Sequence, residues 1–200
     1  MKLLITRPSP YARKAWAAVL DLGLQNRVAI EELPARMPTV PKPDLEALNP
    51  LGKVPTLVRE GAHPILDSPV IVAFLDWMAG GDRLIPAEPE ARWSALTLEA
   101  VADGMMDAGV VIRVEQLAPE GQRRGDEVAA HQAKIARALD LLEREPPAAA
   151  FHVGQLALVC AIDWLRFRRL CADPLAGRPR LAAWHAALAD RPSLAATRPA

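Results

Sequence analysis

The residues best suited to chemistry lie in the stretch Ser9-Pro10-Tyr11-Ala12-Arg13-Lys14. Apolar residues at 2–6 predict a strand before it, and apolar residues at one-face spacing after it predict a helix. The Ser9 hydroxyl and the free N–H groups of the first helical turn would then face one small volume at the carboxyl end of the strand. Such a volume favours an anion, because these groups donate hydrogen bonds and the helix dipole adds a favourable field.

A second helix start could bind charged groups. Ser68 stands at the expected N-cap, with Pro69 at the first helical position. The Ser68 hydroxyl and the free N–H groups of such a helix start can bind a carboxylate. Both Ser9 and Ser68 also fit a purely structural role, because serine is a common helix cap.

Composition narrows the range of partners. The chain has 200 residues, 51% of them hydrophobic, and its formal net charge is +0. A core of that size fits one domain or two small ones. The neutral balance argues against a nucleic-acid partner and favours a small molecule. We find no signal-peptide pattern and no apolar run long enough for a membrane span, so we expect a cytoplasmic protein without a membrane partner.

Cysteine and histidine usage predicts neither disulfide nor metal chemistry. Cys160 and Cys171 have a spacing that fits neither a redox dithiol nor a zinc pair, so we expect buried free thiols. The histidines lie far apart along the chain, and none has metal-ligand spacing to a cysteine or to another histidine. We therefore predict no metal.

The elements that must position these residues differ between the two halves of the chain. In the first half, 28–30 predicts a second strand parallel to the first, followed by a proline-rich connection (Pro34, Pro38, Pro41 and Pro43) with one helical turn near 45–48. Segments 54–58 and 64–66 predict an antiparallel hairpin. The helix from Ser68 ends at Gly80-Gly81.

The second half predicts helices only. Their expected ranges are 90–117, 128–142, a fully apolar segment 156–162 and a last helix from 181 to 191. Gly104 and Gly109, inside the first of these, indicate close packing. Asp103 and Asp107 lie one turn apart on the same helix face, which is unfavourable unless a positive or polar group meets them.

Together these residues resemble the glutathione S-transferase family, most closely its bacterial members whose first helix opens Ser-Pro-Tyr-x-Arg-Lys. The matching stretches follow each other at the family's separations, over nearly the whole chain. They are 9–14, Asn49-Pro50-Leu51-Gly52-Lys53-Val54-Pro55-Thr56-Leu57, Asp67-Ser68, Leu84-Ile85-Pro86, and the tail from Arg178-Pro179 through Trp184 to Arg191-Pro192-Ser193. The resemblance implies an α/β thioredoxin-like domain at 1–79, a linker at 80–89 and an all-α helical domain at 90–200.

The resemblance also implies a binding site for glutathione as co-substrate. Pro55 would be cis, and Val54 would offer its backbone to the extended tripeptide. Asp67 and Ser68 would hold the γ-glutamyl end. Lys53 is the candidate for the glycine carboxylate.

The implied reaction is attack of the glutathione thiolate on a small hydrophobic electrophile. Ser9 and the helix N-terminus would stabilise the thiolate, which is the reactive form of a thiol whose free pKa is near about 8.5. Tyr11, Met106 and Arg113 are candidates for the second-substrate wall, although packing or solvent exposure would explain them equally well. The family further implies a homodimer with a detoxifying role.

Two other functions stay open. The chain could be a non-catalytic binding or interaction protein on the same fold, with an unshifted thiol pKa. It could also be a glutathione-dependent isomerase or dehalogenase, in which the adduct has a different fate. The motif lacks both cysteines of the related Cys-Pro-x-Cys sequence, which argues against dithiol oxidoreductase activity.

One departure from the family concerns stability. Many relatives begin the buried helix of the second domain with Ser or Thr and an Asp three residues later. Here His152 and Gln155 stand in those places. Histidine is the poorer cap, while Gln155 can still reach back to the capping backbone.

Overall fold

The first half of the chain forms a mixed four-stranded sheet. The computed structural model describes residues 1–35, 42–148 and 150–199. The strand order is β2-β1-β3-β4, with bounds Lys2–Ile5 (β1), Ala29–Glu32 (β2), Thr56–Arg59 (β3) and Ala62–Ile65 (β4). β1 and β2 are parallel, while β1–β3 and β3–β4 are antiparallel. The predicted strand–helix–strand unit and hairpin are thus confirmed.

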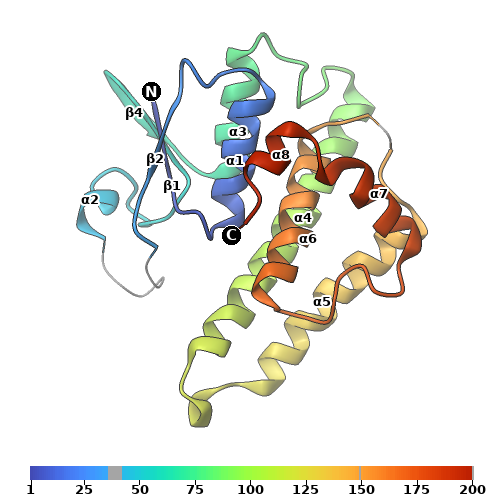
Figure 1. Cartoon of the computed structure of the whole chain (residues 1–200). Coiled ribbons are helices and arrows are strands. Elements are labelled where there is room, and N and C mark those ends of the chain that lie inside the picture. The colour runs from blue at the N-terminus through green and yellow to red at the C-terminus, as the bar shows by residue number, and fades with distance from the viewer. Residues whose placement is uncertain (36–41, 149, 200) are drawn as a thin grey trace.

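Two helices cover one face of this sheet. α1 (Pro10–Asp21) and α3 (Ser68–Met78) pack side by side between the sheet and the helical half of the molecule (Figure 1). The expected turn after the proline-rich connection is α2 (Pro43–Glu46), on the other side of the sheet. Pro38 and Pro41 of that connection lie outside the described residues.

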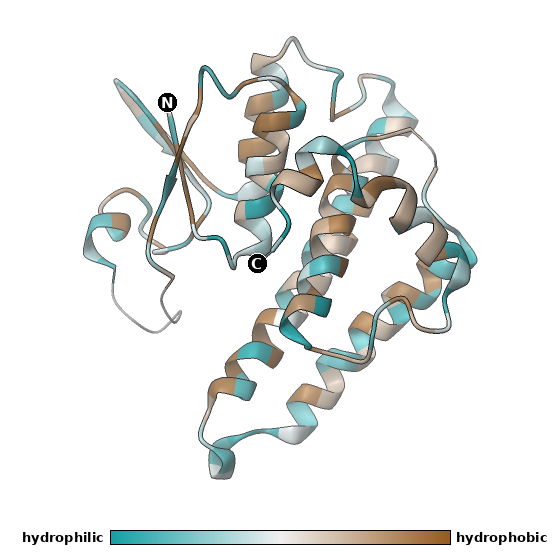
Figure 2. Ribbon diagram, viewed as in Figure 1, coloured by the Kyte–Doolittle hydropathy of each residue, from teal (hydrophilic) through white to brown (hydrophobic). Residues whose placement is uncertain are grey.

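The second half is helical, as predicted. It consists of α4 (Pro89–Leu117), a 3-10 turn at Glu120–Gln122, α5 (Gly125–Arg144), α6 (Val153–Arg168), α7 (Pro179–Ala189) and α8 (Pro192–Ala196). α6 is buried along most of its length and packs against both α4 and α1. The short α8, which the sequence did not indicate as a separate helix, lies against α1 and closes the core there (Figures 1 and 2).

Close packing was correctly predicted at Gly109 and wrongly at Gly104. A Cβ atom at Gly109 would lie 2.5 Å from Trp164 Cζ3, so only glycine lets α4 approach α6 this closely. A Cβ atom at Gly104 would meet nothing within 4 Å. The glycine at 104 therefore has no packing role.

Two helix starts differ from the expected capping, one in the residue that caps the helix and the other in a single side-chain contact. Asp67, not Ser68, is the N-cap of α3, and Ser68 is the first helical residue. At α6 the His152 cap is confirmed, because its Nδ1 accepts a hydrogen bond from Gly154 N at 3.1 Å. Gln155 does not reach back to this cap, since its side-chain amide donates to the Ala148 carbonyl instead.

The His152 cap predicts a loss of stability in acid. Burial lowers the pKa of the His152 ring below its ordinary value of 6.5, so the unfolded chain binds this proton more tightly than the folded protein. The stabilising contribution is therefore present above about pH 6.5 and is lost as pH falls toward the folded pKa. We expect His152→Ser to gain about 1 kcal/mol in unfolding free energy at pH 5.5 and less at pH 8. Urea titrations at both pH values measure this, with His63→Ser, an exposed histidine, as control. An equal difference at both pH values contradicts the assignment.

Candidate functional site

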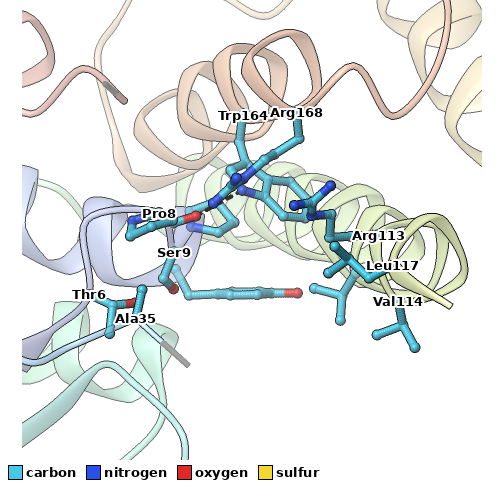
Figure 3. A pocket seen from close by; sticks show the side chains of 12 residues that line it. Thr6, Pro8, Ser9, Ala35, Arg113, Val114, Leu117, Trp164 and Arg168 are labelled. Atoms are coloured by element: carbon cyan, nitrogen blue, oxygen red, sulfur yellow. Dashed lines mark hydrogen bonds between the residues drawn. The ribbon is translucent and has the colours of Figure 1, made fainter. Parts of the chain in front are cut away.

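A cavity of about 370 Å³ lies between the start of α1 and the helical half. The loop after β1 and the first turn of α1 form one side, and α4 and α6 form the other (Figure 3). Its lining residues are Thr6, Pro8, Ser9, Pro10, Tyr11, Ala35, Val110, Arg113, Val114, Leu117, Trp164 and Arg168. The cavity thus brings together three predicted site residues: Ser9, Tyr11 and Arg113.

Ser9 is both a helix cap and a free hydrogen-bond donor. Its backbone is extended (φ −87°, ψ 122°), and its Oγ accepts a hydrogen bond from Ala12 N at 3.2 Å. Capping uses only a lone pair of the hydroxyl, and the O–H donates to no other group among the described residues, so it can donate toward the cavity. Trp164 Nε1 donates to the Pro8 carbonyl at 2.9 Å and ties this loop to α6. The two roles that the sequence left as alternatives are therefore compatible.

Tyr11 cannot replace Ser9 as a donor without losing a bond. Its hydroxyl donates to Asp107 Oδ1 across the junction of α1 and α4. Burial, together with this hydrogen bond to a carboxylate, raises the pKa of Tyr11 well above its ordinary range. The phenol therefore stays protonated with its proton committed to Asp107.

The turn before β3 presents a free backbone edge. The Val54–Pro55 peptide bond is cis, as expected. Asn49, which is buried, holds the turn: its Nδ2 donates to Lys53 O at 2.8 Å and to Thr56 Oγ1 at 3.1 Å. Within the described residues, the backbone N–H and C=O of Val54 make no hydrogen bond. An extended peptide can therefore pair with Val54 as an added strand would.

The remaining predicted binding residues lie outside the cavity lining. Lys53 and Asp67 are exposed, while Ser68 is buried at the start of α3. Proline at 69 has no N–H, and the first backbone bond of α3 is donated by Ile71 to the Asp67 carbonyl. The N–H groups of Ser68 and Val70 are thus available to an anion at this helix start.

Met106 was a candidate for the second-substrate wall, with core packing as the alternative, and the structure favours packing. Its side chain is 0% exposed and belongs to the core between α4, α5 and α6. Val110, Arg113 and Leu117 follow it along α4 at helical spacing and do line the cavity. Sequence periodicity identifies such a face but not the turn at which it leaves the core.

A buried ion network attaches α1 to the helical half. Lys14 Nζ, in a side chain that is 0% exposed, lies 2.9 Å from Glu99 Oε1 and 2.8 Å from both Asp103 carboxylate oxygens. Burial raises the pKa of Asp103, and the Lys14 charge opposes that shift. The Tyr11 hydroxyl donates to Asp107 on the same face of α4. The like-charge pair Asp103 and Asp107 therefore has one positive and one polar partner, as the sequence predicted.

A second network lies beside the first. Arg13 is 2.9 Å from Asp163 Oδ2, and His185 is 2.7 Å from Asp163 Oδ1. Although burial opposes the shift, the His185 hydrogen bond and the Arg13 charge lower the pKa of Asp163. Arg13 and Lys14 belong to the stretch 9–14 that the sequence analysis singled out. Their acidic partners lie far away in the chain and could not be predicted from that stretch.

We also searched the described part of the chain for a metal-binding cluster, a membrane-spanning helix and a disulfide. There, no group of three or more His, Cys, Asp or Glu side chains could hold a metal ion. No helix among these residues is long and apolar enough to cross a membrane. Cys160 is buried and Cys171 half-buried, and both are free thiols.

Comparison with known proteins agrees with this architecture. Residues 8–77 match the model of the glutathione S-transferase N-terminal domain, and residues 125–187 match that of the C-terminal domain. The chain therefore belongs to the glutathione S-transferase family, with its thioredoxin-like domain followed by a helical domain.

Individual relatives cover the whole chain. An uncharacterised GST-like protein of Escherichia coli K12, YibF, is 34% identical over 204 residues, covering 100% of this chain and 98% of that protein. A glutathione transferase family member from Pseudomonas fluorescens Pf-5 with bound glutathione is 37% identical, with a TM-score of 0.94 over 100% of this chain and 98% of that one. A structure from the same organism with bound S-(propanoic acid)-glutathione is 36% identical, with a TM-score of 0.88 and 100% coverage of both chains.

Proposed function

We propose that this protein is a glutathione transferase that joins the glutathione thiolate to an electrophilic carbon of an apolar second substrate. The observation that carries the proposal is the Ser9 hydroxyl, which lines the cavity at the start of α1 and donates its proton to no group that the structure describes. A hydrogen bond from Ser9 to sulfur favours the thiolate over the thiol, and the α1 N-terminus adds a favourable field.

The residues around Ser9 suit the tripeptide. The unpaired backbone of Val54 can hold the extended chain, and the free N–H groups at the α3 start, with Ser68, can bind the γ-glutamyl carboxylate. Asp67 would pair with the amine and Lys53 with the glycine carboxylate. Bound glutathione in the 37%-identical relative supports this assignment.

In the proposed reaction, tested here with an aryl chloride, the thiol loses its proton to solvent and the thiolate sulfur forms a C–S bond to the carbon that bears chlorine. The C–Cl bond breaks, and chloride leaves with the electron pair. The test is to incubate the protein with glutathione and 1-chloro-2,4-dinitrobenzene and to follow the thioether by absorbance and mass spectrometry. Thioether formed faster than without protein supports the transferase. Glutathione binding without acceleration would identify a binding protein on the same fold.

We also propose that the protein is a homodimer with a detoxifying role in the cytoplasm. Val70, Phe74 and Trp77 lie on one face of α3, and Val70 and Trp77 are 52% and 71% exposed. An exposed apolar face of this kind is typical of an association surface. The free cysteines fit a reducing compartment.

The dimer proposal predicts that Trp77→Asp is monomeric, because it places a charge in the contact. Sedimentation velocity measures this, with Leu141→Asp, an exposed apolar residue of α5, as control. A monomeric unmodified protein, or a dimeric Trp77→Asp variant, contradicts the assigned surface.

A further inference from the structure

Two arginine side chains line the helical side of the cavity without a carboxylate partner. Arg113 comes from α4 and Arg168 from α6 (Figure 3). Among residues 1–35, 42–148 and 150–199, neither guanidinium forms an ion pair. Arg113 has one long contact, 3.4 Å from its NH1 to Gln116 Oε1, and the Arg168 guanidinium lies 4.8 Å from the Phe167 ring centroid.

The other partly or fully buried cations of this region are paired. Lys14 has Glu99 and Asp103, and Arg13 has Asp163. Burial and the nearby charge of Arg113 lower the pKa of Arg168, which shows that the two like charges disfavour each other. Both guanidinium groups remain charged near neutral pH, because arginine does not lose its proton in proteins. The cavity therefore has an uncompensated positive side.

We propose that the second substrate is an apolar electrophile that carries a carboxylate, which Arg113 and Arg168 bind together. Val110, Val114 and Leu117 would contact its apolar part. This inference rests on the proposed transferase function and names its substrate class. Guanidinium groups suit the task because their planar donors match the two oxygens of a carboxylate.

The position of the arginines favours the second substrate over glutathione itself. The groups proposed for the two glutathione carboxylates, Lys53 and the α3 start, belong to the first half of the chain. Arg113 and Arg168 belong to α4 and α6, in the second half of the chain, which forms the helical side of the cavity. An electrophile bound in the cavity would then place its carboxylate on the two arginines and its reactive carbon at the thiolate beside Ser9.

The test uses 4-chloro-3-nitrobenzoate and its methyl ester, which share the reacting carbon and differ in charge. In both, the thiolate forms a C–S bond to the carbon that bears chlorine, and the C–Cl bond breaks with chloride taking the electron pair. The thiol proton goes to solvent, so no further reactant is needed. We measure kcat/KM for each compound and divide it by the uncatalysed rate constant with glutathione.

We expect this ratio to favour the acid over the ester by at least about tenfold, the typical effect of a hydrogen bond to a charged group. In the double variant Arg113→Met/Arg168→Met, which keeps most of the apolar stems, the preference falls to about one. Arg166→Met, on the same helix but outside this cavity, keeps the preference. Loss of glutathione affinity in the double variant would instead assign the arginines to the tripeptide and overturn the proposal.

The outcomes separate this proposal from the transferase function. Conversion of the ester without preference for the acid leaves the transferase intact and overturns the carboxylate site. Conversion of neither compound counts against the transferase, and calorimetry with the synthetic conjugates then decides the site. S-(4-carboxy-2-nitrophenyl)glutathione should bind at least about tenfold more tightly than its methyl ester, and equal affinities would overturn the proposal.

Discussion

Replacing Ser9 by alanine is expected to lower kcat/KM for conjugation of glutathione with 1-chloro-2,4-dinitrobenzene about a hundredfold, the usual cost of losing one donor to a developing or bound anion. The Ser9 hydroxyl lines the cavity, and within residues 1–35, 42–148 and 150–199 its proton is donated to no other group. Without it, less of the bound glutathione is thiolate at neutral pH. Steady-state kinetics at pH 6.5 measure the loss, which should lie in kcat more than in the KM for glutathione.

Two further variants separate donation from capping. The alanine change also removes the cap of α1, at a cost of about 1 kcal/mol of stability. Ser9→Thr keeps both the cap and the donor, so it should retain most of the activity. Ser9→Asp caps the helix but its carboxylate cannot donate, so it should be stable and inactive. An Asp variant as active as the unmodified protein would show that Ser9 acts only as a cap.

Replacing Lys14 by methionine is expected to cost about 3–5 kcal/mol of unfolding free energy, the largest stability effect that we predict. The change leaves Glu99 and Asp103 without their buried cation. Because the raised pKa of Asp103 makes the folded protein bind its proton more tightly than the unfolded chain, this group's contribution to stability falls as pH rises. Loss of Lys14 raises the pKa of Asp103 further. The loss of unfolding free energy in Lys14→Met should therefore be larger at pH 8 than at pH 5. Guanidinium chloride titrations measure it.

An exposed ion pair supplies the matched control. Lys2 lies 3.1 Å from Glu31, but their side chains are 62% and 47% exposed. Lys2→Met should therefore change stability by no more than about 1 kcal/mol. Combining Lys14→Met with Glu99→Leu and Asp103→Leu removes all three charges of this network and should recover most of the loss. Equal effects of Lys14→Met and Lys2→Met would show that the buried network contributes nothing particular.

The fold was predictable because its signals are local. The short apolar run before Ser9, the glycine pair after α3 and the fully apolar segment 156–162 of α6 each specify an element without reference to distant residues. Errors occurred where the choice depends on a neighbour. Gly104 and Gly109 look alike in the sequence, and only the distant residues packed against Gly109, with Trp164 nearest, distinguish them.

The site was predictable in part. The place of Ser9 in the site can be predicted from one local feature, the junction between a strand and a helix. Trp164 and Arg168 reach the cavity from α6, far away in the chain, and could not be predicted in that way. Nothing in the local sequence of Arg168 indicates which groups face it. The like-charge pair Asp103 and Asp107 was the one local sign of a long-range partner, and it correctly required the groups that Lys14 and Tyr11 supply.

The central claim is tested most directly by a pH titration of the ultraviolet thiolate absorbance of glutathione bound to the purified protein. The account predicts that bound glutathione ionises well below the free thiol pKa of about 8.5, and that Ser9→Ala moves its pKa back toward that value. Bound glutathione whose pKa equals that of the free thiol would contradict the account.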